Sequence, residues 1–165
     1  MGKNAGQNFT DNESNVIIGN NAMETADSGE HFNIAIGDSA LQSLNGSSSD
    51  GNVAIGHQAL KSLAVAGPAM VAIGFEAGEN AVTPNNSVYI GYQAVGTGAA
   101  TGNDNVVIGY AAGKALVSGH SSVFIGKDAG LSATNNYDNI VIGYQAFNAA
   151  DGGEHYNIAI GTDAL

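Results

Sequence analysis

The chain alternates between short apolar runs and polar connectors, and one nine-residue pattern recurs along it. Asn33–Leu41, with the sequence NIAIGDSAL, is a clear copy. A glycine anchors each of nine copies, and successive anchors lie 17 to 19 residues apart. The anchors are Gly19, Gly37, Gly56, Gly74, Gly91, Gly109, Gly126, Gly143 and Gly161. A period this short and regular predicts a solenoid, in which every copy forms one coil stacked on the coil before it.

Three apolar positions are constant around the anchor glycine. The residue before it is Ile in all nine copies, the residue three before it is Val or Ile, and the residue three after it is Ala. β-branched side chains at alternate positions favour a short strand, whereas glycines and polar turn clusters interrupt the chain too often for a helix. We therefore expect an all-β protein, a parallel β-solenoid of nine coils of about 18 residues each.

Period-two alternation also separates the two faces of each strand. We expect the Val/Ile pair to point into the coil and the residue between the pair to point outward. This middle column is apolar in all nine copies: Ile17, Ala35, Ala54, Ala72, Tyr89, Val107, Phe124, Val141 and Ala159. An apolar outward column predicts symmetric self-association. The alternative interpretation is a loop that folds over this face, or exposed alanines that cost little.

A longer period overlies the coil repeat. Residues 1–14 carry no copy of the motif and are interpreted as a polar lead-in or a degenerate first coil, followed by the nine-coil solenoid over residues 15–165. Asn15–Leu41 and Asn139–Leu165 align without gaps, and 16 of the 27 positions are identical. Because seven coils thus form a unit that begins again, we expect the chain to be a segment of a longer fibre.

A polar column lies four residues before the anchor. It holds Asn in six copies and Ser in two: Asn15, Asn33, Asn52, Asn105, Asn139 and Asn157, with Ser87 and Ser122. Asparagine side chains stacked in this way can bond from coil to coil as a ladder, or cap the turn into the strand. The column is predicted to be structural.

Composition excludes several kinds of partner. Four Lys and no Arg stand against 15 acidic residues, for a formal net charge of −11. This balance argues against nucleic acid and against an anionic membrane surface. No apolar run is long enough to span a bilayer, so we expect no membrane insertion, and the first residues lack the apolar core of a signal peptide. The absence of cysteine excludes disulfides and thiolate metal sites.

No residue pattern points to an enzyme. The repeats contain no Ser-His-Asp set and no pair of carboxylates at positions that could act together in catalysis. They also contain no glycine motif of the phosphate-binding kind. We expect no catalytic residue, no cofactor and no bound metal. Acidic loops such as Asp27–Glu30 leave Ca²⁺ open as a ligand, because it prefers oxygen donors, although the glycine-rich nonapeptide of calcium-binding β-rolls is absent.

Two groups of residues are candidates for receptor contact. The first lies in two equivalent loops, where a His stands between a Glu and an aromatic residue; this could be a solvated loop, half of a metal site or a ligand contact. The second follows the anchor, where aromatic rings could bind sugars through their faces or pack on one another. The candidates are Glu30, His31, Phe32, Tyr92, Tyr110, Tyr144, Glu154, His155 and Tyr156.

The motif N-[VI]-x-I-G-x-x-A over Asn15–Leu165 resembles the head repeats of YadA-type trimeric autotransporter adhesins and the related repeats of bacteriophage tail fibres. The resemblance implies a left-handed parallel β-roll, with three chains packed around a central axis and the glycine-bearing strand lining the inside. It carries over no catalytic residue. The coil here is longer than the usual coil of the adhesin heads, and neither anchor domain nor stalk is present.

Together these features predict a structural and adhesive fibre segment. We expect a homotrimer that contacts a cell-surface glycan or protein receptor through variable loops. The expected location is a virion tail fibre or an extracellular surface appendage, and the missing signal peptide in this chain favours the phage-like particle. The alternative is a purely structural spacer shaft that binds no ligand.

Overall fold

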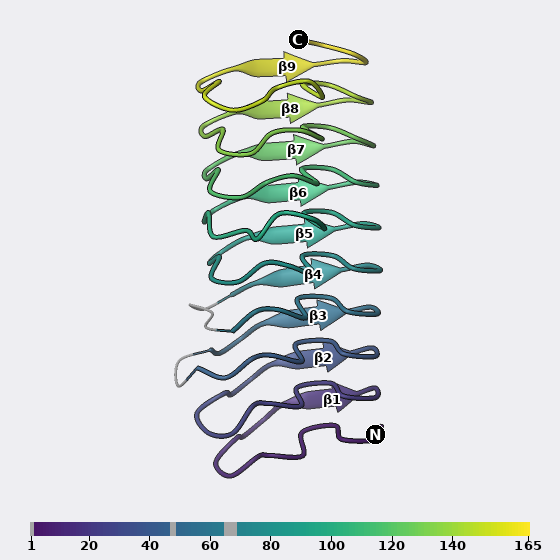
Figure 1. Cartoon of the computed structure of the whole chain (residues 1–165), viewed down its shortest axis with the longest axis vertical. Coiled ribbons are helices and arrows are strands. Elements are labelled where there is room, and N and C mark those ends of the chain that lie inside the picture. Colours follow the sequence, from purple (N-terminus) through teal and green to yellow (C-terminus); the bar gives the residue numbers. More distant parts are fainter. Residues whose placement is uncertain (1, 47–48, 65–68) are drawn as a thin grey trace.

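The computed structural model describes residues 2–46, 49–64 and 69–165, which wind into one parallel β-solenoid (Figure 1). Nine three-residue strands form a single sheet in chain order. They are β1 (Val16–Ile18), β2 (Ile34–Ile36), β3 (Val53–Ile55), β4 (Val71–Ile73), β5 (Val88–Ile90), β6 (Val106–Ile108), β7 (Val123–Ile125), β8 (Ile140–Ile142) and β9 (Ile158–Ile160). The predicted all-β solenoid with a coil of about 18 residues is confirmed. Among the described residues, no helix is long and apolar enough to cross a bilayer.

Every strand pairs in parallel with the next, and equivalent positions of neighbouring copies lie side by side. In the middle of the sheet, for example, Tyr89 of β5 is paired with Val107 of β6, and Ile90 is paired with Ile108. The strands are short because the anchor glycine turns the chain immediately after the Ile. This register places each sequence column along one line of the rod.

A second ladder of hydrogen bonds joins the coils on the side that follows the anchor. The backbone N–H of Leu41 donates to the carbonyl oxygen of Ala59 at 3.1 Å, and that of Leu60 donates to Ala77 at 3.0 Å. Here residues two and four after the anchor have positive φ, such as Ser39 at 57° and Leu41 at 51°. The coils are therefore hydrogen-bonded on two sides, although only one side consists of strands.

The anchor glycine is required for two separate reasons. Gly91 has a φ of 131°, which side-chain-bearing residues rarely adopt. A Cβ atom there would also lie 2.4 Å from the carbonyl oxygen of Gly109 in the next coil. The same close approach recurs at each anchor from Gly19 to Gly143. A side chain at this position would push neighbouring coils apart.

The prediction of which strand face is buried was wrong. The middle residue of each strand points into the coil: Ala35, Ala54, Ala72, Tyr89, Val107, Phe124 and Val141 are all fully buried. The Val/Ile pair points outward, and its side chains range from half-buried to exposed, with Ile160 65% exposed. The interior of the coil accepts one side chain from each strand, which is Ala in four copies and Ile, Val, Tyr or Phe in the other five.

Two coils, those of β3 and β7, place the larger of two facing core residues on opposite sides. The coil of β3 has a small strand centre, Ala54, and a large residue four after its anchor, Leu60. The coil of β7 has the reverse arrangement, with Phe124 at the strand centre and Gly130 four after the anchor. A Cβ atom on Gly130 would lie 2.4 Å from Cδ1 of Phe124. Both coils therefore fill the core with one large and one small residue, and the large residue comes from the strand in one coil and from the opposite side in the other.

Residues 2–14 continue the stack beneath β1 without forming a strand. The N–H of Gly6 donates to the carbonyl of Ala22 at 3.0 Å, and that of Thr10 donates to Asp27 at 2.8 Å. Gly2 lies against the backbone of Gly19 as the anchors lie against one another. This segment therefore packs as part of a coil.

The first prediction concerns the glycine stack. Gly91→Ala should destabilise the rod by about 3 kcal/mol or more, because the new methyl group meets a backbone carbonyl that cannot move alone. Gly161→Ala is the matched control, since it has the same left-handed backbone but no atom within 4 Å of the added Cβ. It should cost only the backbone strain of about 1–3 kcal/mol. Thermal melting by circular dichroism measures both; equal losses would contradict the stacking argument.

The second prediction concerns the exchanged volumes. Phe124→Ala should cost about 3–5 kcal/mol by leaving a cavity. Gly130→Leu alone should also destabilise, because it collides with the ring. The double variant copies the arrangement of Ala54 and Leu60, so it should recover most of the loss. Urea unfolding measures the three free energies, and a double variant as unstable as the sum of the singles would refute the exchange.

Candidate functional site

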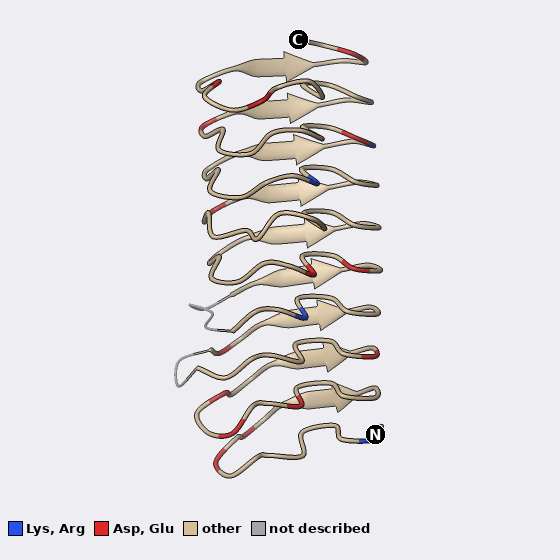
Figure 2. Ribbon diagram, in the orientation of Figure 1, with Lys and Arg blue, Asp and Glu red and all other residues tan. Residues whose placement is uncertain are grey.

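The outward Val/Ile face is an apolar feature that runs along all nine strands of the sheet. It consists of the first and third residue of each strand, all Val or Ile, two from each of nine strands. Figure 2 shows that the strands carry no charged residue, while Asp and Glu lie on the segments that connect them. The face is half-buried in the central strands and more exposed at β1, β8 and β9.

The asparagine column is a hydrogen-bond ladder and a turn cap at once. The side-chain oxygen of Asn15 accepts from the N–H of Asn33 at 2.7 Å, and Asn33 Oδ1 accepts from Asn52 N at 2.8 Å. The amide nitrogen of Asn33 donates to the carbonyl of Ser49 at 2.9 Å and so fixes the connector. Serine performs both functions over a shorter reach: Ser87 Oγ accepts from Asn105 N at 3.0 Å and donates to the carbonyl of Asn85 at 3.0 Å. The predicted structural role is confirmed.

The aromatic column lies along the corner that follows the anchors. Its rings are stacked: His57 on Phe75, Phe75 on Tyr92 and Tyr92 on Tyr110, with centroids 4.9, 5.2 and 5.1 Å apart and planes within 12°. Each inner ring therefore has both faces covered by neighbours. A sugar cannot stack on the faces of Tyr92, and the column supports the packing interpretation rather than sugar binding.

Lysine enters the same column between two tyrosines. The ammonium nitrogen of Lys127 lies 5.7 Å from the ring centroid of Tyr110 and 5.4 Å from that of Tyr144. A cation at these distances is attracted to the ring faces. Tyr110 and Tyr144 are thus also engaged with a neighbour in the column.

The paired loops, Gly29–Asn33 and Gly153–Asn157, hold their histidines by the same hydrogen bond seven coils apart, although the ring of His155 also stacks on that of Tyr137 with centroids 3.5 Å apart. Nδ1 of His31 accepts from the backbone N–H of Glu13 at 3.0 Å. Nδ1 of His155 likewise accepts from the N–H of Tyr137 at 3.2 Å. Because Nδ1 acts as an acceptor, the neutral ring carries its proton on Nε2. Each histidine therefore has one nitrogen held by the coil below and one available as a donor.

The glutamates of the paired loops differ in their surroundings. Glu30 is fully buried, and burial, followed by the charge of Asp27, raises the pKa of its carboxyl group. Burial also opposes ionisation of Glu154, but hydrogen bonds from Asn136 Nδ2 at 2.6 Å and from Gly152 N at 3.1 Å lower its pKa overall. A ligand on the rod surface does not reach the buried carboxylate of Glu30.

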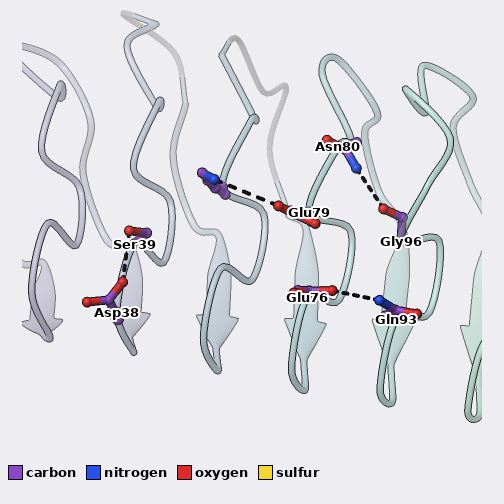
Figure 3. A network of polar contacts seen from close by, with 8 residues as sticks. Asp38, Ser39, Glu76, Glu79, Asn80, Gln93 and Gly96 are labelled. Carbon is purple, nitrogen blue, oxygen red and sulfur yellow. Dashed lines mark hydrogen bonds and ion pairs between the residues drawn. The ribbon is translucent and has the colours of Figure 1, made fainter.

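Polar side chains on the second side of the rod bond between neighbouring coils (Figure 3). Gln93 Nε2 donates to Glu76 Oε2 at 2.7 Å, and Asn80 Nδ2 donates to the carbonyl of Gly96 at 2.7 Å. These contacts repeat the coil-to-coil pattern of the backbone, so they stabilise the stack rather than form a pocket.

The remaining carboxylates of this side are also engaged. Hydrogen bonds from Asn20 and then Ser39 lower the pKa of Asp38. Lys61 Nζ lies 3.7 Å from Glu79 Oε1, a half-buried ion pair at the surface that contributes little to stability. Within residues 2–46, 49–64 and 69–165, no group of three or more His, Asp or Glu side chains is placed to hold a metal ion.

Sequence reasoning missed a left-handed position in every coil. The residue just before the asparagine column has a φ between 51° and 72° wherever it is not glycine, and Gly51 occupies it with a φ of 69°. A signal was present in the sequence, because most copies place Ser, Gly, Asn or Asp there, the residues that tolerate positive φ. Phe32 and Tyr156 occupy the same position in the paired loops.

Comparison with known proteins adds no relative to this picture. No family model, no curated protein and no solved structure matches the chain. The resemblance of the motif to YadA-type heads and phage fibre repeats therefore stays a prediction from the sequence.

The third prediction tests the asparagine column at a buried central position. Asn105→Ala removes the acceptor of Ser122 N and the donor to Gly119 O, which are bonded at 3.1 and 2.8 Å. Leaving such groups unpaired should cost about 2 kcal/mol or more. Asn105→Ser keeps the acceptor, as Ser87 does, so it should lose clearly less. Chemical denaturation compares the two, and indistinguishable losses would argue against the ladder.

Proposed function

We propose that the chain is a structural and adhesive fibre segment in which three parallel copies pack through their Val/Ile faces. The observation that carries the proposal is the outward Val/Ile pair of each strand, which forms an uncharged apolar strip along the whole sheet. Exposed apolar patches of this extent mark interaction sites in soluble proteins.

The dimensions of the strip support self-association along its length. Three residues of strand are about 10 Å wide, and nine strands spaced by about 4.8 Å give a strip about 38 Å long. Its area is thus on the order of 400 Å², the size of the largest apolar patch of a typical monomer, which is often a functional surface. Copies in parallel register would place Ile against Ile at every level, and the resemblance to trimeric heads supports three copies rather than two.

Charge also favours this face as the contact. The chain has a formal net charge of −11, so copies repel one another wherever acidic connectors meet. The strands hold no charge, while the red residues in Figure 2 lie beside the strip and not on it. Packing through the strip keeps acidic loops in water, where they are available for other contacts.

The adhesive part of the proposal rests on the connectors. They differ in length and sequence on a regular scaffold, which suits receptor contact by a virion tail fibre or a surface appendage. The second candidate is a spacer shaft that binds nothing. The aromatic column favours the spacer interpretation for its own edge of the rod, because the faces of its stacked rings are covered by neighbouring rings.

The fourth prediction tests the assembly. Light scattering after size exclusion should give three times the chain mass for the wild type. Ile90→Lys with Ile108→Lys should give a single-chain mass with unchanged far-UV circular dichroism, because both side chains point outward and a lone coil tolerates a charge there. Ser118→Lys, on an exposed connector, is the control and should stay trimeric. A wild-type monomer with intact β-structure would remove the proposal.

A further inference from the structure

The left-handed position before the asparagine column contains two residues that stability does not explain. In seven coils it holds a small or polar residue: Ser14, Gly51, Ala69, Asn86, Asp104, Ser121 and Asp138. In the other two coils it holds Phe32, with a φ of 60°, and Tyr156, with a φ of 61°. Bulky side chains are disfavoured in this conformation compared with Gly, Asn or Asp.

Burial does not compensate for this strain. The side chain of Phe32 is 65% exposed, and that of Tyr156 is 74% exposed. Both lie in the same context, Gly-Glu-His-aromatic-Asn, at equivalent places seven coils apart. A residue that strains the backbone and remains in water twice, in matching loops, indicates a role outside folding.

The rings of Phe32 and Tyr156 are not covered face to face as in the aromatic column, although the Tyr156 side chain also interacts with that of Tyr137. The ring of Phe32 lies 6.2 Å from that of His31 with the planes tilted by 58°. Tyr156 meets Tyr137 at 5.6 Å and His155 at 6.5 Å, with planes 90° and 80° apart. Neither Phe32 nor Tyr156 is stacked face to face with another ring. An aromatic surface is therefore open beside the histidine.

The adjacent histidine adds a directional donor. Nδ1 of His31 and of His155 is held by a backbone N–H of the coil below, which leaves Nε2 as the donor of the neutral ring. An open ring face binds the C–H surface of a pyranose, and a nearby N–H donor binds one of its hydroxyl groups. The pair of side chains thus matches the two kinds of surface on a sugar.

Charge narrows the class of sugar. With a formal net charge of −11, the chain repels sialylated, sulfated or phosphorylated glycans. Glu30 is buried behind the surface, and no lysine or arginine occurs in either paired loop. The surroundings therefore favour an uncharged ligand.

We propose that Phe32 with His31, and Tyr156 with His155, form two equivalent binding sites for a neutral saccharide. The inference rests on the proposed adhesive function and names its ligand class. Seven coils separate the two sites by about 34 Å along the rod. A three-chain rod presents six such sites, so weak single contacts add up to firm attachment on a glycan-coated surface.

The test uses the whole chain and an array of neutral hexose and N-acetylhexosamine oligosaccharides beside sialylated and sulfated ones. The wild type should bind neutral oligosaccharides. The double variant Phe32→Asn, Tyr156→Asn should lose about tenfold or more of this binding. Because Asn tolerates the left-handed backbone, the variant should melt at the same temperature as the wild type or higher. Its mass by light scattering should not change.

Tyr92→Asn is the matched aromatic control. It removes a ring whose faces are covered, so it should melt lower yet bind the same oligosaccharides. The inference is overturned if the wild type binds no oligosaccharide or only acidic ones, or if the double variant binds as well as the wild type. It is equally overturned if the double variant melts lower or changes mass, because Phe32 and Tyr156 would then be packing residues. A monomeric wild type that binds through them would overturn the assembly but support the saccharide sites.

Discussion

The close contact between anchor glycines of successive coils is the constraint on which the rest of the structure depends. At each corner the backbone of one coil approaches the next so closely that a Cβ atom would overlap its carbonyl group, as at Gly91 against Gly109. This approach sets the parallel register of the three-residue strands and of the second hydrogen-bonded side. Without it, neither ladder could form at every level.

Because the strands pair in register, residues at equivalent positions of successive repeats contact one another along the rod. Asn side chains bond from coil to coil because the glycine stack brings equivalent positions together, and the same spacing lets Phe75, Tyr92 and Tyr110 stack at 5.2 and 5.1 Å. The residues that stabilise the stack are therefore different from the residues that are exposed for contact with a ligand. Residues whose surfaces are covered by the next coil serve the stack, whereas Phe32 and Tyr156 are exposed at positions that strain the backbone.

The filled core explains why an apolar face remains outside. One residue from each strand and buried apolar residues from the other side fill the coil, so the Val/Ile pair lies outside it. A single chain then carries an uncharged strip, with its acidic residues on the segments that connect the strands. Self-association through this strip is consistent with both its apolar surface and the repulsion among the connectors.

The sequence by itself determined the repeat, the strands, the glycine corners and the asparagine ladder, because each is a property of one position repeated at a fixed period. It could not determine which strand face is buried. Alternation is unchanged when the faces are exchanged, and both columns here are apolar. Only the tertiary structure decided this, because the path of the chain through the coil turns Ala35 inward and leaves the flanking Ile34 and Ile36 on the outer face. The structure likewise decided that Glu30 is buried and that Phe32 has a left-handed backbone, because both depend on how one coil lies against its neighbours.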